Sequence, residues 1–152
     1  MTDINIDNLI AEIYRLWEIR ENLLEGELSP EGAWIHKYHV TRAYQSGAVE
    51  TYTYAKWQAD KPIFKRNPKK NARPIKPGKN EEYTNHQHIG SVDNNWEVVE
   101  QAYQSWENRQ LLEAVEKALK DIGEIVSEVI AEEQILIKTR EDRKFTDPHQ
   151  NS

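Results

Sequence analysis

The chain has 152 residues, of which 38% are hydrophobic and 30% are charged, and its formal net charge is −6. This composition suits an elongated, thin-cored domain better than a compact globule, and the absence of Cys excludes disulfides, thiolate metal sites and cysteine nucleophiles. No run approaches the ~18 apolar residues of a membrane span, and the first residues do not resemble a secretory leader. We therefore expect a soluble, cytoplasmic protein that does not contact the membrane.

Charge is distributed unevenly along the chain. Residues 54–80 contain nine basic residues and one acid, which gives a local charge of +8, whereas the remaining residues carry −14. The same stretch is rich in Pro and Asn, and it has no counterpart elsewhere in the sequence. It divides the chain into a helical arm, a head and a second arm.

Residues 4–25 are expected to form the first helical arm. Apolar residues recur there at spacings of three and four, which is the period of a helix. Gly26 and the Ser29-Pro30-Glu31-Gly32 segment that follows supply a stop and a turn.

The pattern changes to alternation in the head, which we place at residues 33–90. Residues 34–41, 49–57 and 83–89 are expected to be strands, and Gln45-Ser46-Gly47 is expected to be the hairpin turn between the first two. The basic loop occupies residues 58–80. Because successive strand residues face opposite sides, Trp57 is expected in the core and Tyr54 at the surface.

Residues 93–140 are expected to form a long second helix, capped by Asp93 or Asn94. At 1.5 Å per residue the first arm spans roughly 33 Å and the second roughly 70 Å, so the distal half of the long helix lacks a partner within its own chain. We expect self-association there, with a dimer as the simplest form, or a protein partner. The alternative is a break at Gly123 that folds the helix back. The expected seam is close to a heptad pattern and consists of Leu119, Ile122, Val126, Val129 and Leu136.

These ranges predict an α+β fold in which two helical arms form an antiparallel coiled coil, joined by a small antiparallel β head with a long basic loop. Residues 1–143 are expected to make one elongated domain, and residues 144–152 a flexible tail.

A resemblance supports this architecture. The chain combines the run Tyr52-Thr53-Tyr54-Ala55-Lys56-Trp57, a Lys-rich gap, His88-Ile89-Gly90, and a helix with Trp106, Arg109 and Leu112. In this order it resembles a family of short prokaryotic proteins of unknown function, some of them near mobile elements, with a tyrosine-rich hairpin between helices. Members of that kind often carry Cys pairs in the hairpin. This chain has none, so the resemblance implies no metal role.

The basic segment predicts contact with DNA or RNA. Lys and Arg bind backbone phosphate regardless of base sequence, exposed rings stack on unpaired bases, and the acidic arms would repel nucleic acid and leave the head to engage it. Two alternatives stay open: a solvated loop that keeps the chain soluble, and an acidic protein partner. The candidate nucleic-acid-binding residues are Tyr54, Lys56, Lys61, Lys65, Arg66, Lys69, Lys70, Arg73, Lys76 and Lys79.

Catalytic and metal chemistry lack their usual sequence patterns. His86 and His88 share a face of the third expected strand, but no thiolate or obvious carboxylate completes a ligand set. There is no Gly-rich phosphate loop, nucleophile elbow or His-Glu-x-x-His sequence. We therefore expect no enzyme activity, no metal and no cofactor. The leading hypothesis is a nucleic-acid-binding accessory protein whose coiled coil mediates assembly; the alternative is an oligomeric adaptor that binds another protein and no nucleic acid.

Overall fold

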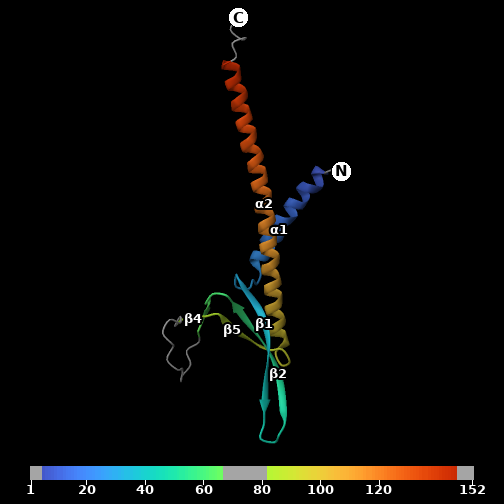
Figure 1. Cartoon of the computed structure of the whole chain (residues 1–152). Coiled ribbons are helices and arrows are strands. Elements are labelled where there is room, and N and C mark those ends of the chain that lie inside the picture. The colour runs from blue at the N-terminus through green and yellow to red at the C-terminus, as the bar shows by residue number, and fades with distance from the viewer. Residues whose placement is uncertain (1–4, 67–81, 147–152) are drawn as a thin grey trace. The chain divides into compact units, whose positions relative to one another are not determined.

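The computed structural model describes residues 5–66 and 82–146, and the side chains of these residues except 145 and 146. The fold is α+β, with a small antiparallel sheet and two helices (Figure 1). The chain divides into two compact units, Met1–Glu21 with Glu113–Ser152, and Asn22–Leu112. Neither helix of the described ranges has an apolar stretch long enough to cross a membrane. In chain order the elements are α1 (Ile6–Glu25), β1 (Ala33–Ala43), β2 (Val49–Ala59), β3 (Phe64–Lys65), β4 (Tyr83–Thr84), β5 (His86–Ser91) and α2 (Trp96–Thr146).

The unit Asn22–Leu112 is built on a three-stranded antiparallel sheet in the order β1-β2-β5. The predicted hairpin turn is confirmed, because the Tyr44 N–H donates to the Ala48 carbonyl at 2.9 Å and the Gly47 N–H donates to the Tyr44 carbonyl at 3.0 Å. Gly47 has a φ of 85°, a conformation that glycine adopts without steric cost. This turn fixes the whole β1–β2 register, from Ala43 opposite Val49 to Ala33 opposite Ala59.

One face of this sheet carries the core of the unit. Trp57 is buried, as predicted, and clusters with Ala33, Ala59, Phe64 and Ala102 of α2. Three half-buried residues, Ile35, Ile89 and Trp106, pack against this cluster. The cluster is small, which agrees with the low apolar content of the sequence.

The third expected strand, residues 83–89, is two strands in the structure. β5 pairs with β2, whereas β4 pairs with β3 in a separate two-stranded sheet. Asn85 separates β4 from β5: its carbonyl accepts a hydrogen bond from the Ala59 N–H at 2.8 Å, and its side-chain amide donates to the Asp60 carbonyl at 3.2 Å. Because Asn85 is bound to the end of β2, the chain bends there and cannot continue as one strand.

The segment before β1 is fastened to α2. The Ser29 N–H donates to the Ser105 carbonyl at 3.0 Å, and the Arg109 guanidinium donates to the Ser29 carbonyl at 2.8 Å. A turn follows, closed by a bond from the Ala33 N–H to the Pro30 carbonyl at 3.2 Å, with Gly32 at a φ of 79°. These contacts hold the segment that leads into β1 next to α2.

The long helix differs at both ends from its predicted range of 93–140. Asn95 is its cap, in place of Asp93 or Asn94, because the Asn95 carbonyl accepts the first helical bond, from the Val99 N–H at 3.2 Å. Asn94 instead donates its N–H to the Ser91 hydroxyl at 3.2 Å in the turn that precedes the helix. The helix continues beyond residue 140 to Thr146, so residues 144–146 of the expected tail are helical, and residues 147–152 lie outside the described residues. It is also continuous through Gly123, so the fold-back alternative is wrong.

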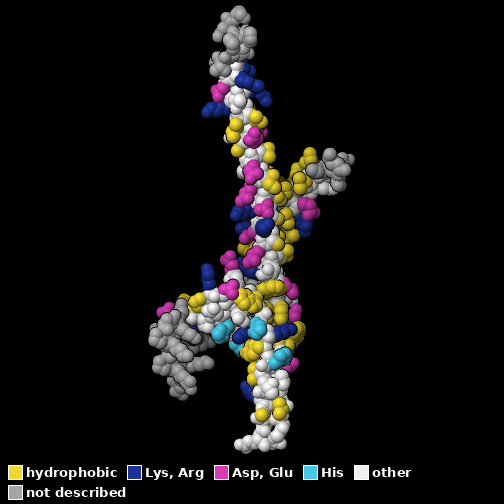
Figure 2. Space-filling model, viewed as in Figure 1, with side chains coloured by type: hydrophobic (Ala, Val, Ile, Leu, Met, Phe, Trp, Pro, Cys, Tyr) yellow, Lys and Arg dark blue, Asp and Glu magenta, His cyan; other side chains and the backbone are white. Residues whose placement is uncertain are grey.

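The distal part of α2 is exposed in the unit formed by Met1–Glu21 and Glu113–Ser152. Val115 is buried and Leu119 and Ile122 are half-buried, but every residue from Gly123 to Lys144 is exposed. Hydrophobic side chains follow this exposed stretch (Figure 2). No residue of Ile6–Glu25 is buried either. The apolar surface of α1 and of the distal part of α2 is therefore largely uncovered.

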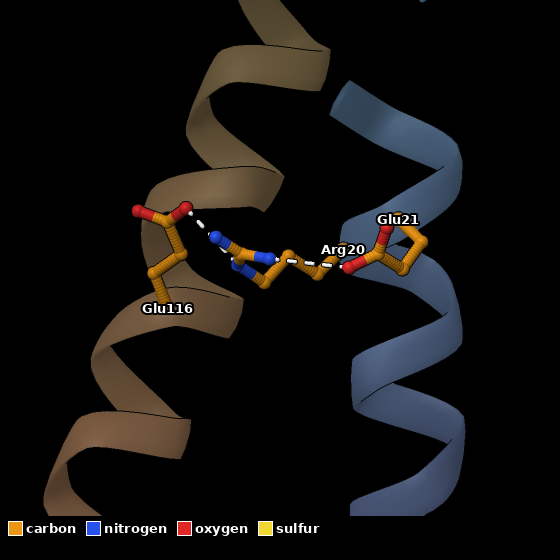
Figure 3. Close-up of polar contacts among 3 residues, drawn as sticks. All are labelled: Arg20, Glu21 and Glu116. Carbon is orange, nitrogen blue, oxygen red and sulfur yellow. Dashed lines mark hydrogen bonds and ion pairs between the residues drawn. The ribbon is translucent and has the colours of Figure 1, made fainter. Parts of the chain in front are cut away.

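An ion pair between described residues joins the two helices within this unit. The Arg20 guanidinium lies 3.3 Å from the Glu116 carboxylate and also 3.3 Å from that of Glu21 (Figure 3). Such exposed pairs contribute at most about 1 kcal/mol. This contact places the end of α1 beside α2, and an antiparallel coiled coil between them stays a prediction.

Candidate nucleic-acid interface

The sheet of the unit Asn22–Leu112 has a second face, opposite the core, on which aromatic and basic side chains meet. Residues directly opposite each other in an antiparallel ladder share a face. His36 of β1 lies opposite Lys56 of β2, which lies opposite His88 of β5, and Tyr38 lies opposite Tyr54 two residues further along these strands. We call this surface the outer face; it consists of Trp34, His36, Tyr38, Tyr54, Lys56, Gln58, His86 and His88.

Four rings form a continuous row across the outer face. The ring centres of His36 and Tyr38 are 6.3 Å apart with nearly parallel planes, those of Tyr38 and Tyr54 are 5.8 Å apart, and those of Tyr54 and His88 are 5.9 Å apart. The row therefore crosses all three strands. Tyr38 and Tyr54 are half-buried by their neighbours, whereas His36 and His88 are exposed. The neighbours restrict the tyrosine rings while leaving part of each accessible.

Lys56 places a positive charge within this row. Its ammonium nitrogen lies 5.1 Å from the centre of the Tyr38 ring, within the range of a cation–π interaction. Within the described strands, the outer face from Trp34 to Tyr38 and from Tyr54 to Gln58 carries no acidic residue. Histidine side chains gather on the sheet close to Lys and Arg side chains (Figure 2). The electrostatic character of this surface is thus neutral to positive in a chain that is acidic overall.

The chain is held next to the sheet on both sides of residues 67–81, which lie outside the described residues. Phe64 of β3 is buried in the core cluster, and the following Lys65 and Arg66 are exposed. The Arg66 N–H donates to the Glu82 carbonyl at 2.7 Å, which closes the base of the loop beside the β3–β4 pair. Lys61 is exposed between β2 and β3. The other five predicted basic residues, Lys69, Lys70, Arg73, Lys76 and Lys79, lie outside the described residues.

The same side of the sheet continues beyond the outer face to the hairpin tip, where it carries a polar cluster. The Tyr52 hydroxyl donates to the Glu50 carboxylate and lies 2.8 Å from the Tyr44 hydroxyl. The hydrogen bond to Glu50, followed by that to Tyr44, raises the pKa of Tyr52 above its ordinary value, because an ionised phenol would lose the first bond and face the carboxylate charge. Arg42 lies over the Tyr52 ring at 5.6 Å from its centre. The carboxylate makes this tip a poorer phosphate-binding surface than the outer face.

The histidines do not assemble into a metal site among the residues that the structure describes. No group of three or more His, Cys, Asp or Glu side chains is placed there to hold a metal ion. His39 points away from the outer face and makes a hydrogen bond of 3.0 Å with the Thr53 hydroxyl. His36 and His88 instead contribute rings to the row.

Of the outer-face residues, the sequence predicts Tyr54 and Lys56 as nucleic-acid-binding residues, and it places His86 and His88 on one strand face without a role in binding. The others were missed, although the signal was present: a turn at residues 45–47 pairs positions whose numbers add to 92, such as His36 with Lys56 and Tyr38 with Tyr54. The position of His88 had no such signal. The β2–β5 register shifts at a bulge between Ala55 and Lys56, which a reading of local pattern does not reveal.

Comparisons with known proteins give no relatives. No family model matches the chain, and neither the curated proteins nor the solved structures contain a match. A functional proposal must therefore be based on the chemistry of the surface itself.

Proposed function

We propose that this protein is a nucleic-acid-binding accessory protein that contacts DNA or RNA through the outer face and the basic loop. The observation that carries the proposal is the row of four rings with Lys56 among them, on the sheet face opposite the core cluster. Phosphate contacts supply affinity without sequence preference, and rings supply contacts to bases and sugars. The proposal includes no enzymatic activity.

The basic residues support this proposal in two groups. Lys56, Lys61, Lys65 and Arg66 lie on or beside the sheet, and the remaining five lie outside the described residues. Each Lys or Arg that approaches a phosphate releases condensed counterions, so binding must weaken steeply with salt. Several acidic residues of the helices, such as Glu124 and Glu128, repel phosphate and favour the head as the contact surface.

A fluorescence anisotropy titration tests the proposal directly. The full chain is added to a labelled oligonucleotide at a series of salt concentrations. We expect a linear fall of log affinity against log salt, with a slope of roughly −3 to −6 if about five to eight phosphates are contacted. No binding at the lowest salt concentration contradicts the proposal.

The exposed apolar stripe of α2 supports a second part of the proposal, which is assembly through the helices. Two copies of the distal half of α2 can pair and cover Val126, Val129 and Leu136. The competing function is an oligomeric adaptor, in which the same stripe binds another protein and the head binds no nucleic acid. The anisotropy titration separates the two, because the adaptor predicts no affinity for the oligonucleotide at any salt concentration.

A further inference from the structure

The side chains of the outer face also bear on whether the nucleic acid that binds there is single-stranded or double-stranded. We infer that it binds unpaired bases, so that the protein prefers single-stranded RNA or DNA to a duplex. This inference rests on the proposed nucleic-acid function and adds the class of nucleic acid to it.

The first observation is the row of partly accessible rings on the outer face. In a duplex, each base is stacked on its neighbours and only base edges and backbone are available to a protein, whereas an unpaired base has free faces. The row runs through His36, Tyr38, Tyr54 and His88, and the centres of neighbouring rings are 5.8 to 6.3 Å apart. Rings at such intervals suit a strand whose bases lie side by side across a sheet, with about two or three bases engaged.

The placement of charge is the second argument. Lys56 lies in the middle of the row, half-buried, with its ammonium group over Tyr38. Its flexible stem lets the ammonium group leave the ring when a base stacks there and bind the adjacent phosphate. A single cation between rings suits one phosphate chain crossing the sheet. A duplex presents two phosphate chains and favours a broader basic surface than the described part of this face offers.

The third observation is that side chains of the outer face are exposed. The core face is occupied by Ala102 and Trp106 of α2, whereas the outer face within Asn22–Leu112 keeps His36, His86 and His88 exposed and Trp34 37% exposed. These four side chains stay exposed on the outer face, and the absence of acidic residues along this part of the described strands leaves phosphate unopposed.

The test compares strands and matched variants of the full chain. Labelled oligonucleotides of roughly twelve nucleotides, as RNA and as DNA, are titrated as single strands and as duplexes. We expect the single strands to bind at least about tenfold more tightly than the duplexes. The RNA and DNA arms show whether the 2′-hydroxyl contributes, and either preference is compatible with stacking on the rings.

Three double variants separate rings from charge. Tyr38→Leu with Tyr54→Leu keeps the apolar bulk and every charge, and is expected to weaken single-strand binding by about tenfold or more while leaving duplex binding unchanged. Tyr38→Phe with Tyr54→Phe keeps the rings and is expected to bind like the parent. Tyr14→Leu with Tyr44→Leu, which removes two exposed tyrosines elsewhere, is the matched control and is expected to have no effect.

The possible results separate a failure of the single-strand preference from a failure of the proposed nucleic-acid binding. Equal affinity for single strands and duplexes, or full affinity in the Leu variant, overturns the inference while the nucleic-acid function stands. No binding to any oligonucleotide overturns both. If circular dichroism shows that the Leu variant does not fold, His36→Leu with His88→Leu carries the same test, because both positions are exposed and tolerate substitution.

Discussion

Ile35 of β1 and Trp57 of β2 lie directly opposite each other on the core face of the sheet. Trp57 is the largest buried hydrophobic side chain among the described residues, with 9% of its surface exposed. Its ring packs among residues of β1, β3 and α2, so its loss leaves a cavity bordered by several elements.

Trp57→Ala is expected to lower the free energy of unfolding by about 3–5 kcal/mol. Trp34→Ala is the matched control, because Trp34 lies on the outer face with 37% exposure, and it is expected to change the free energy by less than about 1 kcal/mol. Chemical denaturation followed by circular dichroism measures both. Equal stability of the two variants contradicts the core assignment.

The elements that were predictable from the sequence are those specified by local patterns. The helix of residues 4–25 is present as Ile6–Glu25, and the strands on both sides of the Gln45-Ser46-Gly47 turn are present in the expected alternation, with Trp57 in the core. Burial on one side of a strand and a glycine at positive φ leave direct traces in the sequence.

The remaining features depend on contacts between distant residues. β3 has two residues, too few to show a period, and is recognised by its pairing with β4 across the basic loop. The cap at Asn95 is decided by hydrogen bonds to Ser91, because Asp93, Asn94 and Asn95 are all suitable capping residues. Similarly, the row of rings requires the β2–β5 register, which includes a bulge.

Ser29 offers a second stability prediction. Its hydroxyl is buried and has no hydrogen-bond partner among the residues that the structure describes, whereas the buried hydroxyl of Ser105 donates to the Ala102 carbonyl at 2.7 Å. Ser29→Ala is therefore expected to leave the free energy of unfolding unchanged or to raise it by about 1 kcal/mol, and Ser105→Ala to lower it by about 1 kcal/mol. A loss of stability in Ser29→Ala as large as in Ser105→Ala shows that the Ser29 hydroxyl is bonded in solution.

The hairpin tip gives a prediction for alkaline pH. Glu50→Gln is expected to lower the pKa of Tyr52 towards the ordinary tyrosine value of about 10, because the carboxylate that accepts the hydroxyl's hydrogen bond is removed. The raised pKa in the folded chain means that this contact stabilises the fold below about pH 10 and loses its effect as the pH rises further. The phenolate absorbance of each protein, minus that of its Tyr52→Phe counterpart, measures the shift. An unchanged titration of Tyr52 in the Gln variant contradicts the assignment.

The basic loop gives a prediction about salt dependence. Changing Lys65, Arg66, Lys69 and Lys70 together to Ala is expected to make the slope of log affinity against log salt shallower by roughly 2–3 units, because about 0.7 unit is lost for each contact with a single-stranded phosphate. The fold is expected to be unaffected, since Lys65 and Arg66 are exposed. The matched control removes four exposed charges of α2, Lys117, Lys120, Lys138 and Arg140, and is expected to leave the slope unchanged. Equal effects of the two quadruple variants indicate that binding responds to net charge and not to the loop.

The last prediction is self-association through the distal half of α2. At 1.5 Å per residue the 51-residue helix is about 76 Å long and the 20-residue α1 about 30 Å. Val126 and Val129 are 51% and 61% exposed, and Leu136 is 52% exposed, at heptad spacing. Two copies that pair antiparallel about a two-fold axis between residues 127 and 128 bring Val126 opposite Val129 and Leu119 opposite Leu136. Glu133 then lies opposite Ile122, which weakens one layer of the seam.

Sedimentation velocity is expected to show a dimer for the parent chain and a monomer for Val126→Asp with Val129→Asp, because burying two new carboxylates in the seam is strongly unfavourable. The matched control, Ser127→Asp with Ala131→Asp, adds the same charge off the seam and is expected to remain dimeric. Glu133→Leu removes the one carboxylate from the seam and is expected to tighten the association. A monomeric parent chain contradicts self-association and favours a different protein as the partner of the apolar stripe. If the variant with both Asp substitutions is still a dimer, the dimer contact lies elsewhere in the chain.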